Sequence, residues 1–414
     1  MVETWERSQR PDALARRGRL GVVLLFGNNG FTYANVVPWL PTIKNELELS
    51  NTALGAAVAA MPLGALVLGM LAGPLINRFG SGRTAVGAGL IIAWVLPVVA
   101  LAPNWPVLAA ALFTIGYLDA WTDSAMNAHG LRVQRRYRRT IINTFHAVWS
   151  ISGVAGGLVG ATMAGLGVPM FAHMLAAAVL LTALALIAVR LLLPGDEHSE
   201  RSAPTISAGP AQPSVRLSWR TTGALVALGT LLMLAAAMED AAASWGAVYM
   251  REELAATAFL AGLPFVAASA MMTLGRLTGD RLTDRFGAVN VTRTGSLLAA
   301  LGLGMALALP TPATTIIGFG LVGFGIATLF PLALAAAGEL PGISSGNGVT
   351  IVGWLARAGF LCVPPLIGFI SDSSSLRVGL LLIPLAGLVA ALLSSSLRPR
   401  SAAPSPASPQ QPGG

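Results

Sequence analysis

Residues 280–287 read DRLTDRFG, a charged stretch that separates two long apolar runs. Residues 73–80 read GPLINRFG and lie 207 positions earlier, which is half the length of the 414-residue chain. The last four residues of the two stretches differ only at Asn77 and Asp284, and each stretch follows one apolar run and precedes another. A match at half the chain length predicts that the chain consists of two duplicated halves.

The composition indicates a membrane protein. Hydrophobic residues make up 54% of the chain, charged residues make up only 11%, and the mean hydropathy is +0.70. A soluble globular domain carries roughly 25% charged residues, so the composition excludes that class. Because the bilayer offers no partner to an unpaired backbone group, apolar runs of about 20 residues are expected to be transmembrane helices.

Twelve such runs divide into six plus six around a polar linker. We therefore predict an all-α integral membrane protein with twelve transmembrane helices in two pseudo-symmetric six-helix bundles. The predicted helices cover residues 20–42, 53–76, 84–103, 105–129, 141–163, 168–193, 219–243, 255–279, 290–309, 313–337, 348–370 and 377–396. The predicted domains are an N-terminal tail at 1–18, bundles at 19–193 and 219–397, a linker at 194–218, and a tail at 398–414 that we expect to be disordered.

Arginine determines the predicted orientation. All of the 26 basic residues except Lys44 are arginines, and most lie in the tails, the linker and the short loops on one side of the membrane. Positively charged loops face the cytoplasm, so we expect a multi-pass protein of the cytoplasmic membrane with both termini cytoplasmic. The basic balance then reflects orientation and not nucleic-acid binding. Residues 1–20 lack a cleavage site after a short apolar run, which predicts an uncleaved tail.

The charged turn of the first half resembles the loop signature of the major facilitator superfamily. In that signature a glycine precedes an acidic–arginine pair, a second glycine and a basic tail. The matching residues here are Gly73, Asn77, Arg78, Gly80 and Arg83. Two positions depart from the signature, because Asn77 replaces the acidic residue and Ser81 replaces a basic one.

The turn of the second half matches the signature at Asp284, Arg285 and Gly287, but its leading glycine is displaced to Gly279 and the trailing basic residues are absent. The resemblance spans roughly residues 18–397 and implies a secondary active transporter. Three phrases are similar to a poorly characterised bacterial group of the superfamily, whose members have been likened to sugar permeases and to drug exporters. They are MNAHG at 126–130, FHAVWS at 145–150 and GRLTGDR at 275–281.

The two charged turns are predicted to act as a gate. A charge at a helix end interacts with the helix dipole, and with a neighbouring helix only while that side of the protein is closed. The alternative is that both turns are simply solvated. The predicted gating residues are Asn77, Arg78, Gly80, Asp280, Asp284, Arg285 and Gly287.

Ionisable residues inside the predicted helices are candidates for coupling transport to protons, because a charge at a helix centre costs about 2.5–3.5 kcal/mol on insertion. Asp119, Asp123 and Asn127 share one face of the fourth helix, where the two acids are the coupling candidates and Asn127 is expected to line the solute cavity. A carboxyl group in a partly dry cavity can exchange a proton near neutral pH; the alternative is a structural pair with an arginine. His146 on the fifth helix is expected either to relay protons with Asp123 or to donate a hydrogen bond between helices.

A polar stripe on the first helix predicts the wall of a solute cavity. Asn28, Thr32 and Asn35 follow helical spacing and offer hydrogen-bonding groups to a polar solute. Trp39 continues the stripe but is better explained as an anchor at the membrane interface.

Acidic and basic residues on two later helices extend this prediction. Glu239 and Asp240 are adjacent on the seventh helix, and neighbours on a helix point about 100° apart, so only Glu239 is expected to face the cavity. On the eleventh helix Trp354 and Arg357 form part of a second stripe, and Arg357 falls near the middle of the membrane. An arginine there must pair, with Glu239, with Asp119, or with a carboxylate or phosphate of the solute; we favour internal pairing.

The sequence contains no nucleotide-binding loop and no cluster with metal-ligand spacing, so we expect no cofactor, no metal and no enzymatic activity. We predict a proton-coupled secondary active transporter for a small polar or amphipathic organic solute, and the apolar and aromatic lining favours efflux. The alternative is proton-coupled uptake of a sugar-like or other small metabolite, and a non-transporting receptor is less favoured. The expected partners are the solute, protons and membrane lipids, with no nucleic acid, and the expected state is a monomer.

Overall fold

The computed structural model describes residues 11–195, 218–341, 343 and 345–398, and almost all of these residues are helical. The part of the chain that the structure describes contains no β-strand, which confirms the all-α class. The predicted C-terminal tail lies outside the described residues except for Arg398, and the predicted linker lies outside them except for its two ends.

The described part of the first half forms six helical segments, two of them interrupted by a short 3₁₀ turn. In chain order they are α2 (Ala13–Ala34), η1 (Val37–Trp39) and α3 (Leu40–Glu46); α4 (Asn51–Leu68), η2 (Gly69–Leu71) and α5 (Ala72–Phe79); α6 (Ser81–Ala100); α7 (Trp105–Tyr137); α8 (Ile142–Gly165); and α9 (Met170–Leu191). The first segment begins before its predicted start at residue 20 because Asp12 caps it, accepting a hydrogen bond from the backbone N–H of Ala15.

The described part of the second half repeats this arrangement. Its segments are α10 (Trp219–Ser244) with α11 (Gly246–Glu252); α12 (Ala258–Phe286); α13 (Ala288–Ala308); α14 (Pro312–Ile326) with α15 (Leu329–Gly338); α16 (Ser345–Ser373); and α17 (Leu376–Leu380) with α18 (Leu382–Leu393) and η3 (Ser394–Leu397). Eleven helices of the described chain are long and apolar enough to cross a membrane. The remaining predicted span is α7, 33 residues long, which includes Asp119 and Asp123.

Helix caps repeat at the same interval as the sequence match, which confirms the duplication. The N-caps Ser50 of α4 and Thr257 of α12 are 207 positions apart, and so are the N-caps Asn104 of α7 and Thr311 of α14. In all four the side-chain oxygen accepts a backbone N–H of the first helical turn. Polar caps at equivalent positions make equivalent helices begin in register.

The two charged turns have the same conformation. Gly80 has φ 84° and ψ 153°, and Gly287 has φ 78° and ψ 151°, a region that is essentially open only to glycine. In each turn the arginine that precedes the aromatic residue stacks on its ring, with 5.3 Å from the guanidinium carbon of Arg78 to the centre of Phe79 and the same distance in the second half. The sequence match therefore reflects a repeated structure.

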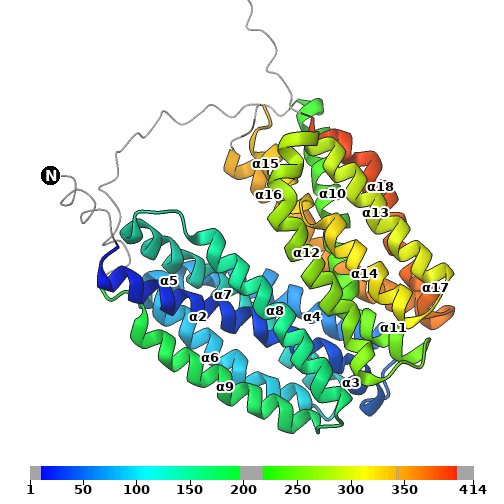
Figure 1. Cartoon of the computed structure of the whole chain (residues 1–414), viewed down its shortest axis with the longest axis horizontal. Coiled ribbons are helices and arrows are strands. Elements are labelled where there is room, and N and C mark those ends of the chain that lie inside the picture. Colours follow the sequence, from blue (N-terminus) through cyan, green and yellow to red (C-terminus); the bar gives the residue numbers. More distant parts are fainter. Residues whose placement is uncertain (1–10, 196–217, 342, 344, 399–414) are drawn as a thin grey trace, which may run out of the picture.

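The two halves are separate bundles that diverge towards one end of the molecule (Figure 1). That end carries the start of α2, the end of α9 and the start of α10, and we call it the linker end. The opposite end, which carries α3 and α11, we call the far end. Between the halves, α4 packs on α16 and α8 packs on α12.

Glycines let the halves approach closely at these two crossings. A side-chain carbon at Gly55 on α4 would collide with the backbone of Pro364 on α16, and one at Gly262 on α12 would collide with Ala161 on α8. Gly55 and Gly262 are 207 positions apart, so the duplicated chain places the same small residue at both crossings.

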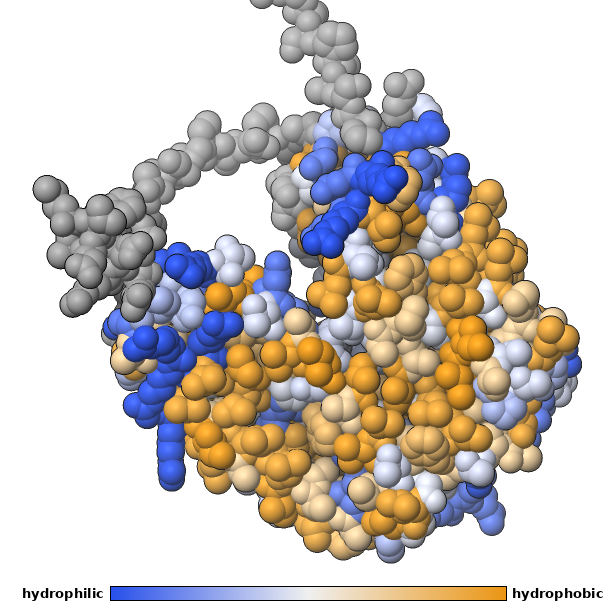
Figure 2. All heavy atoms as spheres, in the orientation of Figure 1, coloured by the Kyte–Doolittle hydropathy of each residue, from blue (hydrophilic) through white to orange (hydrophobic). Residues whose placement is uncertain are grey.

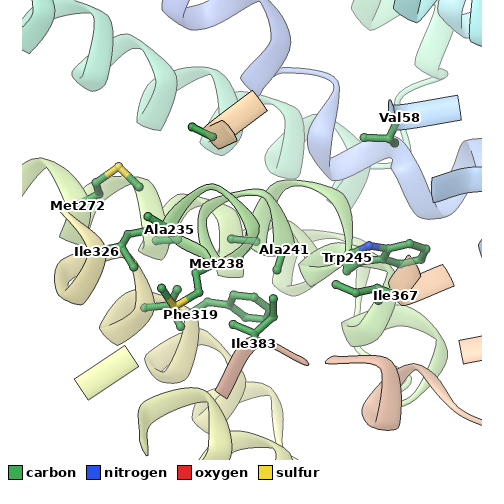
Figure 3. Packing of buried hydrophobic residues seen from close by; sticks show 14 of the residues in the cluster. Val58, Ala235, Met238, Ala241, Trp245, Met272, Phe319, Ile326, Ile367 and Ile383 are labelled. Carbon is green, nitrogen blue, oxygen red and sulfur yellow. The ribbon is translucent and has the colours of Figure 1, made fainter. Parts of the chain in front are cut away.

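The surface is apolar around the middle of the molecule and hydrophilic at its ends (Figure 2). Large hydrophobic side chains such as Leu301, Met305 and Leu392 are more than 60% exposed. In water such a surface would aggregate, whereas in a bilayer it contacts lipid. Inside the second half, Met238 of α10 and Trp245, which follows α10, pack among Phe319, Ile383 and Ile367 (Figure 3).

The halves differ in packing at one pair of equivalent positions. In the first half Trp121 of α7 donates a hydrogen bond of 2.8 Å to the carbonyl oxygen of Leu68 and fills the space between helices. The positions 207 residues later are Thr328 and Gly275, and they line a pocket of about 450 Å³ between α12, α13 and α14. The second half is therefore less densely packed at this point.

Candidate functional site

A cavity of about 400 Å³ lies between the two halves. Its wall comes from α2, α4, α7 and α8 of the first half and from α10, α12 and α16 of the second. Most of the lining side chains are apolar. The polar and aromatic lining residues are Asn29, Tyr33, Asp119, Trp149, Ser150, Glu239, Asp240, Phe265, Ser269, Thr273, Arg276 and Phe360.

A chain of hydrogen bonds holds Asp119 in this wall. The indole N–H of Trp149 on α8 donates to Oδ1 of Asn29 on α2 over 2.7 Å. The Nδ2 of Asn29 in turn donates to Oδ1 of Asp119 on α7 over 2.6 Å. Three helices of the first half thus orient one carboxyl group, and Oδ2 of Asp119 has no hydrogen-bond partner among the described residues. The structure places Asp119 in the cavity, as the sequence predicted.

The second half contributes two acids and one base. Glu239 and Asp240 of α10 both line the cavity, so the prediction that only Glu239 faces it is wrong. The reason is that α10 borders the cavity over a face wide enough to include two successive residues. The hydroxyl of Ser244 donates to Oδ2 of Asp240 over 2.7 Å. Arg276 of α12 also lines the cavity and interacts electrostatically with Glu239.

The other candidates for proton coupling, Asp123 and His146, lie outside this lining, and so does Asn127, which the sequence predicts to line the cavity. Nδ2 of Asn127 donates to the side chain of Asp123 over 3.0 Å, one helical turn away on α7. Asp123 and His146 are exposed, and their charges interact. The ring of His146 meets that of Phe26 edge-on, with 5.2 Å between the centres. The structure thus brings Asp123 and His146 into proximity, and their proposed relay stays a prediction.

The predicted stripe on the first helix faces away from the cavity, which corrects the prediction. Nδ2 of Asn28 donates to the backbone of Leu181 on α9 over 3.2 Å, and the hydroxyl of Thr32 donates to the carbonyl of Asn28 over 2.7 Å. Asn35 is fully buried. The cavity side of α2 is rotated by one residue and presents Asn29.

Trp39 also differs from its prediction as a membrane anchor. Its side chain is buried, and the indole N–H donates to Nδ1 of His173 over 3.0 Å. The contact joins η1 to α9 inside the first half.

Arg357 does not make the predicted internal pair. Among the described residues it forms no ion pair with Glu239 or Asp119, and its guanidinium carbon lies 5.8 Å from the ring centre of Trp354. Both side chains are exposed, and neither is part of the cavity lining. The two residues neighbour each other on α16, but in this conformation they do not reach the acids of the cavity.

The predicted gating turns lie at the linker end, where the halves are apart. Asn77, Arg78, Asp280, Asp284 and Arg285 are all exposed. In the described chain the two arginines stack on rings of their own half and form no ion pair with the other half. A closed linker end is therefore not what this conformation shows, and the gating role stays a prediction.

Among the described residues, the ion pair and the hydrogen bonds that join the halves lie at the far end, and sequence reasoning missed them. Nζ of Lys44 on α3 contacts both carboxylate oxygens of Glu252 on α11, at 2.5 and 2.7 Å. The carboxylate of Asp372 on α16 accepts the backbone N–H groups of Asn51 and Thr52 at the start of α4, each over 2.8 Å. The molecule is thus latched at the far end and open at the linker end.

This architecture, two related helical bundles around a central cavity, defines the class of the protein as a multi-pass membrane transporter. The model of the Major Facilitator Superfamily matches residues 22–242 and 228–414, so the chain belongs to that family. It is 28% identical to an uncharacterized MFS-type transporter of Yersinia pestis over 86% of this chain and 89% of that protein. It is 27% identical to the membrane protein MosC of Rhizobium meliloti over 98% of this chain and all of that protein.

Solved structures of low sequence identity share the fold. A bacterial homologue of the human lysosomal transporter Spinster, in an inward-facing and occupied conformation, superposes with a TM-score of 0.72 at 13% identity and covers 91% of this chain and 95% of that one. A D-xylose–proton symporter superposes with a TM-score of 0.67 at 16% identity, covering 92% and 96%. These findings confirm the predicted family and fold.

Proposed function

We propose that the protein is a proton-coupled secondary active transporter that moves a small polar or amphipathic organic solute out of the cell by alternating access. Both termini lie in the cytoplasm of a monomer in the cytoplasmic membrane, so the linker end is the cytoplasmic end. The far-end latch then closes the outward side, and the structure is an inward-open state. The mostly apolar and aromatic lining of the cavity supports an amphipathic solute and efflux.

The observation that carries proton coupling is the setting of Asp119. In an apolar wall, few contacts stabilise the ionised form of a carboxyl group. For Asp119 the only hydrogen bond among the described residues is the one from Asn29. Oδ2 of Asp119 remains available to take up a proton. Since the two protonation states differ in charge, they differ in how readily the cavity can close around a solute.

Transport into liposomes tests this proposal. The protein is reconstituted with an imposed pH gradient, and three probes are followed: ethidium, radiolabelled uridine and radiolabelled D-xylose. We expect gradient-driven accumulation of at least one probe. Asp119→Asn should abolish this accumulation and spare counterflow of the same probe, because exchange of solute needs no net proton movement.

The control is Asp12→Asn, which removes an acid outside the cavity and should leave accumulation unchanged. Trp149→Phe removes the donor to Asn29 and should weaken accumulation less than Asp119→Asn. Unchanged accumulation in Asp119→Asn would remove this residue from the mechanism. If none of the probes moves by gradient or by counterflow, the transport proposal fails for these solute classes.

A further inference from the structure

The charge of the cavity is opposite to that of the rest of the chain. The protein has 26 basic and 18 acidic residues, a net charge of +8. The cavity nevertheless has three acids in its lining, Asp119, Glu239 and Asp240, and one base, Arg276. An arginine-rich chain that places three carboxyl groups and one guanidinium around its central space creates a locally negative site.

The acids are not all balanced by protein groups. Arg276 attracts Glu239 electrostatically, but the two form no ion pair among the described residues. Asp119 and Asp240 form no ion pair among the described residues, and each uses one oxygen for a hydrogen bond, from Asn29 and from Ser244 respectively. The second oxygen of each is left as an acceptor. Asp119 belongs to the first half and Asp240 to the second, so a donor bound between the halves has an acidic partner on either side.

Aromatic residues supply the other component of a cation site. Tyr33, Trp149, Phe265 and Phe360 line the same cavity. The face of an aromatic ring attracts an ammonium group, and aromatic walls combined with carboxylates are the usual recognition of organic cations. The apolar side chains that make up most of the lining suit the hydrocarbon body of such a molecule. An anionic solute would face like charge, and a sugar has no hydrocarbon body to contact the apolar part of the lining.

We propose that the solute is an amphipathic organic cation, an amine or quaternary ammonium whose nitrogen lies between Asp119 and Asp240. This inference rests on the proposed transport function and names its substrate class. It also explains why each half contributes an acid to the cavity. The cation attracts Asp119 of the first half and Asp240 of the second, so binding draws the halves together.

Binding of three matched probes to the purified full-length protein tests the inference. The probes are 3-hydroxyphenyltrimethylammonium, its neutral isostere 3-tert-butylphenol and the anion 4-tert-butylbenzoate, each measured by isothermal titration calorimetry in nanodiscs. We expect the cation to bind at least about tenfold more tightly than the phenol, since a hydrogen bond or contact to a charged group contributes roughly that factor. The anion should bind most weakly.

Two variants should move the affinity in opposite directions. Asp240→Asn should weaken cation binding by about tenfold to a hundredfold, whereas Arg276→Gln should strengthen it, because it removes the positive charge from the lining. Phenol affinity should stay constant in both variants, which shows that the cavity is intact. Asp12→Asn serves as the control outside the cavity and should leave all three affinities unchanged.

Cation binding that is absent, or no tighter than that of the phenol, overturns the inference. Anion binding that exceeds cation binding and falls in Arg276→Gln would assign the site to carboxylates instead. Liposome counterflow separates this failure from failure of the transport function. If any probe shows counterflow but the cation binds no more tightly than the phenol, the transport function stands and the substrate class fails. If the cation binds preferentially but no probe shows counterflow, the substrate class stands and the transport function fails.

Discussion

Removal of Glu252 should open the far end of the molecule. Lys44 and Glu252 join α3 to α11, and their side chains are 11% and 30% exposed. Loss of one member of a fully buried pair costs about 3–5 kcal/mol, because the other charge is left unpaired. Since Glu252 is partly exposed, we expect about 2–3 kcal/mol for Glu252→Met, lower than the cost at a fully buried site.

This cost falls on the latched state alone, because both side chains become hydrated once the far end opens. The ratio of open to latched molecules at the far end should then rise by about 30- to 150-fold, at about 1.4 kcal/mol for each factor of ten. Spin labels at Leu101→Cys and Leu309→Cys report this ratio, because both residues are exposed at the far end, one on each half. The free Cys362 is replaced by alanine in this background.

Double electron–electron resonance should show a longer distance gaining population in Glu252→Met. Lys44→Met should shift the distance distribution less, because the charge that it leaves unpaired, on Glu252, is the more exposed of the two. The double variant Lys44→Met with Glu252→Met should return towards the original distribution, since two apolar side chains replace a pair without leaving a charge. Asp12→Asn breaks an ion pair within one half and is the control. An unchanged distribution in Glu252→Met would refute the latch.

Three further predictions concern single residues. Asp372→Asn weakens the charged cap on α4 at an exposed site, and the same spin labels should show a shift of only a few-fold. Gly55→Leu should prevent close packing of α4 on α16, so the latched distance should be lost while the protein still inserts into membranes. The hydrogen bond from Arg136 lowers the pKa of Asp12, so its stabilisation is complete above the ordinary value of 3.8 and is lost as the pH falls through the lowered pKa. The small drop in Tm of Asp12→Asn should therefore shrink progressively as the pH is lowered below 3.8, and a drop that does not change with pH would contradict this.

The helices and the duplication could be predicted because their signals are local. Each apolar run and each cap lies within a few consecutive residues, and the two charged turns need only four matching residues to be related. Glycine at Gly80 and Gly287 is required by the backbone itself, so the match survives in the structure as identical turns. Asp119 was also predictable, since a carboxyl group inside an apolar helix must face a cavity or a partner.

The orientation of each helix could not be predicted as well. The polar residues of α2 are spread around the helix, so they do not reveal which face borders the cavity: the sequence favours Asn28, whereas the structure places Asn29 there. The contact between Lys44 and Glu252 joins residues 208 positions apart, on the short helices α3 and α11 at the far end. No local pattern in the sequence relates these two residues. Arg276 lies within the predicted helix 255–279, near its cytoplasmic end, and nothing in the sequence distinguishes it from the neighbouring arginines that set the orientation.

The unequal packing of the two halves has a consequence for how the protein moves. α7 is unbroken over 33 residues and its Trp121 packs against the neighbouring helix through Leu68, whereas its counterpart is divided into α14 and α15 next to an open pocket. A continuous, well-packed helix bends less readily than an interrupted helix beside a pocket. We expect the first half to move as a rigid body and the second half to bend at Thr328. The two duplicated halves would then have different roles in the conformational change.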